Sequence, residues 1–96
     1  MFAAALSAEL RLPAVHSLKE KRAVITPILE GARLRYRVAS AEVAEHDAWQ
    51  RSELGFAAVG RTEGHVRDIL DEVERFVWSF PEVEVLAMSR QWTEEQ

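Results

Sequence analysis

The spacing of hydrophobic side chains changes in a fixed order along the chain, and this order restricts the fold more than any other feature. The first segment alternates, with one side made of Phe2, Ala4, Leu6, Ala8, Leu10 and Leu12. A period of two is typical of a strand with one buried face, and Pro13 ends it. Apolar residues between Val66 and Phe80 recur instead at a period of 3.6, which predicts a helix capped by Thr62 and ended by Pro81.

A second helical segment follows the first strand. Ser17 and Glu20 have the spacing of a capping box, so we expect a helix to begin here. Its apolar stripe consists of Leu18, Ile25, Ile28, Leu29, Ala32 and Tyr36. Pro27 lies opposite this stripe, where a bend towards the core is tolerated.

Three further strands are predicted, over residues 37–45, 54–60 and 82–92, with a polar tail at 93–96. We expect the inward residues of the first two to be Ala39, Ala41 and Val43, and Leu54, Phe56 and Ala58. The polar link between these two strands indicates a hairpin.

The resulting order is β-α-β-β-α-β, an α+β fold of the ferredoxin-like type. It predicts a four-stranded antiparallel sheet with two helices on one face, the third strand lying between the first two. A chain of 96 residues has material for one core, so we expect residues 1–96 to form a single domain. This topology places the start of the first helix and the turn between strands 2 and 3 at the same end.

Composition and motifs exclude several functions. The absence of Cys excludes disulfides and thiolate chemistry. His16, His46 and Asp47 have no established metal-ligand spacing, so we expect no metal, no cofactor and no enzymatic activity. The opening segment is interrupted by Glu9 and Arg11, which predicts neither a signal peptide nor a membrane span, and favours a cytoplasmic protein.

Charge is distributed unevenly. Residues 1–40 hold seven Lys/Arg against three Asp/Glu, a net +4, whereas residues 41–96 hold five against thirteen, a net −8. Local potential steers an anionic partner more than total charge does. The candidate anion- or RNA-binding residues at the shared end are His16, Lys19, Lys21, Arg22, Trp49, Gln50 and Arg51.

The chemistry of these residues suits an anion. Cations in the first helical turn are disfavoured by the helix dipole unless they and the free amides hold an anion together. Trp49 offers a ring for stacking on a base, and His16 and Gln50 offer hydrogen-bond donors. Alternatively, the cations are merely solvated, Trp49 closes the end of the core, and Gln50 and Arg51 orient the hairpin.

The open face of the sheet suggests a second surface. Phe56 is expected in the core, so this face carries small residues and offers no platform for stacking RNA bases. Its predicted members are Ala3, Ala5, Ser7, Gly55, Ala57 and Val59, extended by Leu86, Met88 and Trp92 of the last strand. A smooth apolar face favours a homodimer through sheet-on-sheet packing. A bulge that inverts the last strand is the alternative.

The chain resembles the YlxP-like family, small bacterial proteins classed as a domain of unknown function. Segments 9–13, 16–22, 41–43, 47–51, 54–55 and 81–86 carry the resemblance. It implies a ferredoxin-like fold and a gene that neighbours translation and ribosome-maturation genes. Together with the charge asymmetry, it leads us to expect an RNA- or ribosome-associated module, with a homodimeric interaction or anion-sensing module as the alternative.

Overall fold

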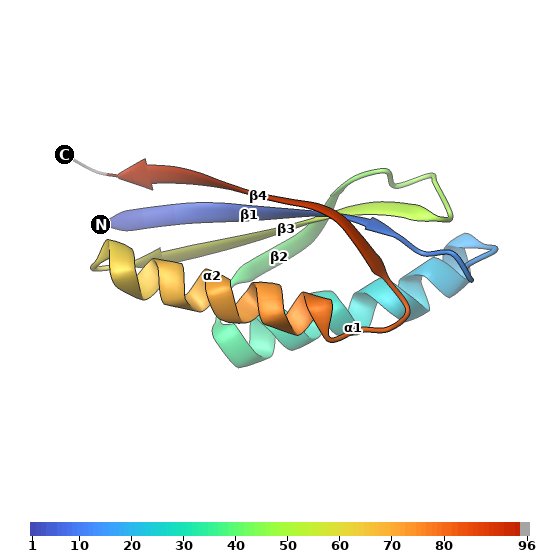
Figure 1. The fold of residues 1–96 in the computed structure, drawn as a ribbon, viewed down its shortest axis with the longest axis horizontal. Coiled ribbons are helices and arrows are strands. Elements are labelled where there is room, and N and C mark those ends of the chain that lie inside the picture. The colour runs from blue at the N-terminus through green and yellow to red at the C-terminus, as the bar shows by residue number, and fades with distance from the viewer. Residues whose placement is uncertain (95–96) are drawn as a thin grey trace.

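Four strands form one antiparallel sheet, and both helices cover the same face of it (Figure 1). The computed structural model describes residues 1–94. The elements are β1 (Phe2–Arg11), α1 (Leu18–Tyr36), β2 (Ala39–Ala44), β3 (Arg51–Gly60), α2 (Glu63–Trp78) and β4 (Glu84–Glu94). The strand order β2-β3-β1-β4 confirms the ferredoxin-like arrangement that the periodicities predict.

The buried side chains form one cluster between the sheet and the helices. It contains the alternating residues of β1, residues 54, 56 and 58 of β3, and the predicted stripes of both helices with the exception of Leu18. Its central members are Leu6, Leu10, Ile25, Ile28, Leu54, Phe56, Val66, Leu70, Val73 and Val77. The predicted inward faces of β1, β3, α1 and α2 are therefore confirmed, and Pro27 lies exposed within α1.

The predicted inward set of β2 is wrong. Ala39, Ala41 and Val43 are exposed, while Ser40 and Glu42 point to the helix side, where they pair in register with Phe56 and Leu54 of β3. Their polar groups have partners there, since the Ser40 hydroxyl donates to the Leu29 carbonyl of α1 at 2.8 Å. An edge strand covered by one helix can turn polar atoms inward when that helix supplies hydrogen bonds.

The predicted facing of β4 is also wrong. The register of β4 against β1 shifts between Glu9 and Leu10, so Leu86 is the extra residue of a bulge. Met88 and Trp92 then pair with the inward residues Ala8 and Ala4 and lie on the helix side. A bulge reverses the alternation of every residue beyond it, which is the alternative that the sequence left open.

The start of β1 and the end of β4 lie at one end of the elongated molecule, and the β2–β3 turn and the start of α1 lie at the other (Figure 1). We call this second end the hairpin end, defined by residues 12–17, the first turn of α1 and residues 45–51.

Several predicted boundaries differ from those of the structure. β3 begins at Arg51 rather than at residue 54, and β4 includes Thr93 and Glu94, while residues 95–96 of the predicted tail lie outside the described residues. Neither helix within 1–94 has both the length and the apolar character needed to cross a membrane.

Candidate functional site

Hydrogen bonds join the two sequence segments of the hairpin end. The Leu12 amide donates to the Gln50 carbonyl at 3.0 Å. The Gln50 side chain donates to the carbonyls of Val15 and Pro13, at 3.0 and 3.3 Å. Gln50 thus fixes the loop before α1 against the β2–β3 turn, which is the orienting role weighed for it as an alternative to anion binding.

The start of α1 is a capping box. The Ser17 hydroxyl accepts a hydrogen bond from the Glu20 amide, and the Glu20 carboxylate accepts one from the His16 amide, both at 3.1 Å. The carboxylate reaches the residue before the cap rather than the cap itself. The Ser17 bond satisfies one free helical amide, that of Glu20, and the Glu20 carboxylate places a negative charge beside the helix start, so both stabilise it.

Lys21 does not belong to the binding surface expected for it. Its side chain is 2% exposed, and its ammonium group donates to the carbonyls of Glu45 and Ala48 at 2.6 and 2.7 Å. The same nitrogen forms an ion pair with Glu42 at 2.7 Å. An ammonium has three donors, and all three are used internally, so Lys21 cannot also contact a partner.

Two residues of this network were absent from the candidate site. Glu42 holds the Lys21 ammonium and accepts a 2.6 Å hydrogen bond from the buried Ser52 hydroxyl, so α1, β2 and β3 meet at one carboxylate. The sequence did contain a signal for Lys21, because it lies four residues before Ile25 and seven before Ile28. A cation on the apolar stripe of a helix is expected to be buried, and a buried cation needs a carboxylate or carbonyl partner.

The other cations of the hairpin end are exposed. Lys19, Arg22 and Arg51 lie at the surface, and no carboxylate of residues 1–93 lies within 4.0 Å of their charged nitrogens. Trp49 is 52% exposed at the tip of the β2–β3 turn, so it does not close the end of the core. These four side chains, together with the exposed His16, are the part of the predicted site that remains available to a partner.

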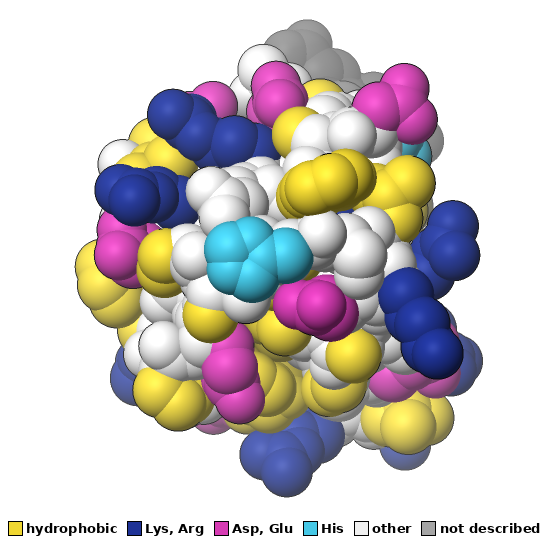
Figure 2. All heavy atoms as spheres, turned by 90° about the vertical axis from the view of Figure 1, so that its right-hand side faces the viewer, with side chains coloured by type: hydrophobic (Ala, Val, Ile, Leu, Met, Phe, Trp, Pro, Cys, Tyr) yellow, Lys and Arg dark blue, Asp and Glu magenta, His cyan; other side chains and the backbone are white. Residues whose placement is uncertain are grey.

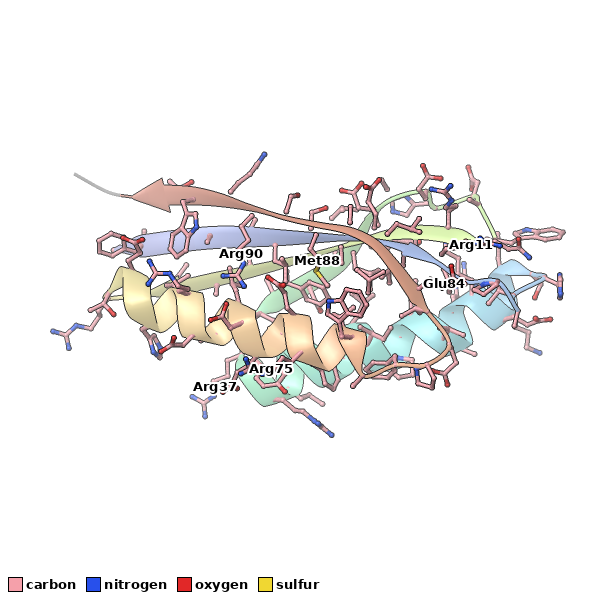
Figure 3. All side chains as sticks on the ribbon, viewed as in Figure 1. Arg11, Arg37, Arg75, Glu84, Met88 and Arg90 are labelled. Atoms are coloured by element: carbon pink, nitrogen blue, oxygen red, sulfur yellow. The ribbon has the colours of Figure 1, made fainter. Side chains whose placement is uncertain are left out.

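Carboxylates are interspersed among these cations. Glu20, Glu45 and Asp47 are exposed at the same end, and Arg11 forms a surface ion pair with Glu84 at 3.9 Å (Figure 3). Figure 2 faces this end and shows Lys and Arg side chains around its margin, separated by acidic and apolar groups. The hairpin end therefore presents separate cations beside an exposed ring, and not one continuous basic patch.

The histidines of this end have local roles. The His46 imidazole lies 3.0 Å from the Glu42 carbonyl, and His16 is exposed. In the part of the chain that the structure describes, no three His, Cys, Asp or Glu side chains converge as metal ligands.

A second ionic cluster lies between β4 and α2. Arg90 of β4 donates to Asp71 at 2.7 Å and to Glu74 at 3.0 and 2.5 Å, and these two carboxylates lie three residues apart on adjacent turns of α2. Burial lowers the pKa of Arg90, but the hydrogen bonds and charges of Asp71 and Glu74 raise it by more, so the net shift is upward. This cluster fastens the edge strand to α2 and leaves no cation free for binding.

Comparison with known sequences assigns a family. Residues 3–90 match the family described as "Protein of unknown function (DUF503)". The chain belongs to the DUF503 family. A member of similar sequence is the "Uncharacterized protein YlxP" of Bacillus subtilis (strain 168), 38% identical over 76 residues that cover 79% of this chain and 83% of that protein. The resemblance inferred from the motifs is thereby confirmed.

Among solved structures, this DUF503 chain is similar to "De novo designed protein Foldit4". The TM-score is 0.54 at 12% identity, with 98% of this chain and 99% of that chain covered. At this identity the likeness concerns the fold alone.

Proposed function

We propose that this protein is a non-enzymatic cytoplasmic module that binds RNA, including RNA exposed on the ribosome, through the hairpin end. The observation that supports this is the exposure of Trp49 together with three cations, Lys19, Arg22 and Arg51, that have no carboxylate partner among the described residues. An exposed ring stacks on unpaired bases, and free cations contact phosphates. The gene neighbourhood that the family resemblance implies agrees with such a partner.

The geometry limits how strong this binding is. Lys21 is internal, so at most three cations face the phosphates, and nearby carboxylates oppose them. Each phosphate contact on a single strand contributes about −0.7 to the slope of log affinity against log salt, so three contacts give about −2. We therefore expect moderate affinity for single-stranded RNA, with base stacking on Trp49 adding about 1–3 kcal/mol.

Filter binding of a single-stranded RNA oligomer across a salt series tests the proposal. The variant R22Q/R51Q is expected to lose at least tenfold in affinity at low salt and to reduce the slope to about −0.7, because one phosphate contact remains. The matched control is R33Q/R67Q, which removes two arginines that already pair with Glu30 and Glu63. Equal losses in the two variants, or no binding by the wild type at low salt, would refute the proposal.

A homodimer through the open sheet face is the second candidate. The exposed residues Ala39, Ala41, Ala57 and Val59 lie on this face, and a shallow hollow of about 280 Å³ lies over β2 and β3. The facing of β4 removes Met88 and Trp92 from the face, which leaves a small apolar area suited to weak, concentration-dependent association.

Sedimentation velocity is expected to detect this dimer at high protein concentration. Ala57 lies opposite both Ala5 and Ala39, so A57K places a charge at the centre of the face and should return the protein to a monomer. A23K, at an exposed position of α1 on the other side of the sheet, is the control with the same +1 change in charge. A monomer at all concentrations rules out this candidate.

A further inference from the structure

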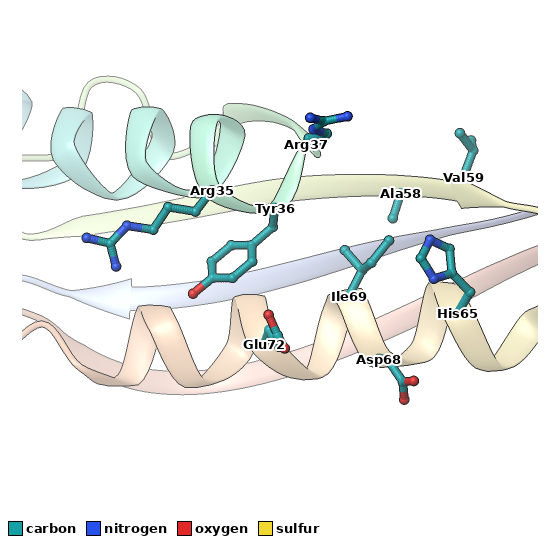
Figure 4. Close-up of a pocket in the computed structure, with 9 residues that line it drawn as sticks. All are labelled: Arg35, Tyr36, Arg37, Ala58, Val59, His65, Asp68, Ile69 and Glu72. Carbon is teal, nitrogen blue, oxygen red and sulfur yellow. The ribbon is translucent and has the colours of Figure 1, made fainter.

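A hollow lies between the C-terminal turn of α1 and the N-terminal half of α2, next to β3 (Figure 4). Its volume is about 550 Å³, within the range of small-molecule sites, roughly 300–1,000 Å³. We call it the interhelix hollow. It is remote from the hairpin end, because the 19 residues of α1 separate the two by about 27 Å at ~1.5 Å per residue.

Two side chains of α1 at this hollow are held by Phe76 of α2. The Tyr36 ring packs edge-on against Phe76 with centroids 5.7 Å apart, and the Arg35 guanidinium lies 5.1 Å from the Phe76 centroid. The close approach depends on Gly31, since a Cβ there would lie 2.5 Å from the Phe76 ring. Arg35 and Tyr36 are therefore positioned before any ligand arrives, which reduces the entropy lost on binding.

Arg37 is placed by an unusual backbone conformation. It ends α1 with φ 57° and ψ 38°, in the left-handed region, and its amide donates to the Arg33 carbonyl. Glycine or asparagine usually occupies such a position, so an arginine there suggests a use for the side chain. Neither Arg35 nor Arg37 has a carboxylate of residues 1–93 within 4.0 Å.

The opposite wall comes from α2 and β3. The His65 ring packs beside Gly60, where an added Cβ would lie 3.0 Å from it. Ala58 and Ile69 provide an apolar surface between His65 and Tyr36 (Figure 4). The Asp68 carboxylate points away from the hollow in this view, whereas Glu72 lies on the helix face beside Tyr36.

These groups match the parts of a nucleotide. Arg37 and the His65 imidazole suit a phosphate, the Tyr36 ring with its aliphatic neighbours suits a flat base, and the Glu72 carboxylate accepts hydrogen bonds from base N–H groups. We propose that the interhelix hollow binds a nucleotide. The source is either a free mononucleotide or one residue of a single-stranded RNA, and this site does not depend on binding at the hairpin end.

Isothermal titration with the four ribonucleoside 5′-monophosphates tests the site. At least one is expected to bind with a submillimolar dissociation constant, and the matching nucleoside without phosphate at least tenfold more weakly. R37N should weaken nucleotide binding at least tenfold without changing the melting temperature by more than a few degrees, because asparagine tolerates the left-handed cap. R67Q, whose arginine pairs with Glu63, is the control and should bind as the wild type does.

A single-stranded RNA oligomer distinguishes a free nucleotide from a residue of RNA as the ligand. It is tested in the R22Q/R51Q background, which weakens RNA binding at the hairpin end. Oligomer binding that this background retains and R37N abolishes assigns the hollow to RNA. Mononucleotide binding at least as tight as oligomer binding assigns it to a free nucleotide. The proposal is overturned if neither probe binds at millimolar concentration, or if R37N binds both as tightly as R67Q does.

Discussion

Replacing Lys21 by methionine is expected to lower the free energy of unfolding by about 3–5 kcal/mol. The substitution keeps most of the buried aliphatic stem but removes the ammonium. It leaves the Glu42 carboxylate without its ion pair and two carbonyls, of Glu45 and Ala48, without a donor. Breaking one half of a buried ion pair is costly because the other half remains desolvated. Urea denaturation followed by circular dichroism measures the effect.

The control is K19M, two residues away on the exposed side of the same helical turn, which we expect to change stability by less than about 0.5 kcal/mol. The double variant K21M/E42Q should be less destabilised than the sum of its single variants, since the carboxylate charge no longer remains unpaired. If K21M costs less than about 1 kcal/mol, Lys21 is not the structural residue described here.

Replacing Phe56 by alanine is the second large effect, with an expected loss of about 3–5 kcal/mol. Phe56 is 1% exposed and pairs with Leu6 of β1 at the centre of the sheet. Small domains have a total stability of about 5–15 kcal/mol, so a large part of it depends on this ring. Thermal and urea unfolding provide the measurement.

Val59 provides the comparison on the same strand. It faces the open side and is exposed, so V59A should remain within about 0.5 kcal/mol of the wild type. RNA affinity of F56A, measured under conditions where it stays folded, should equal that of the wild type, because Phe56 is not a stacking surface. A loss of affinity without a loss of stability would place the ring on the open face instead.

The fold was predictable because four of its six elements have unambiguous periods. Large apolar side chains identify one buried face in each of these elements: the alternating residues of β1, residues 54, 56 and 58 of β3, and the stripes of α1 and α2. β2 lacks such side chains. In Ala-Ser-Ala-Glu-Val-Ala the apolar residues are small, and the inward facing of Ser40 and Glu42 depends on partners in α1 that a local pattern does not contain.

The candidate site was predictable only in part. Topology correctly joined the loop before α1 to the β2–β3 turn. The internal role of Lys21 was not predicted, and that of Gln50 was predicted only as the alternative, because both roles depend on acceptors distant in sequence, the carbonyls of residues 13, 15, 45 and 48. The sequence around Leu86 contains no glycine that would indicate a bulge. Because the bulge adds one residue, the side chains of β4 beyond it point to the opposite faces of the sheet from those predicted. The interhelix hollow combines three elements and has no sequence motif.

The buried and exposed parts of the hairpin end are connected. The Lys21 ammonium donates to the carbonyls of Glu45 and Ala48, which belong to the β2–β3 turn. Trp49 is the next residue after Ala48 in the sequence. Gln50 fixes the other side of the tip to the loop before α1. The exposed Trp49 ring therefore belongs to a turn that Lys21 and Gln50 fix on either side of it. Such support limits the motion of a residue that contacts a partner.

The most direct test is an NMR titration of the isotope-labelled protein with a single-stranded RNA oligomer at low salt. We predict that the Trp49 indole signal and the backbone amides of residues 16–22 and 47–51 shift in a saturable way, and that added salt reverses these shifts. Shifts confined to the open sheet face, or no shifts at the hairpin end at millimolar RNA, would contradict the assignment of this end as the RNA-binding surface.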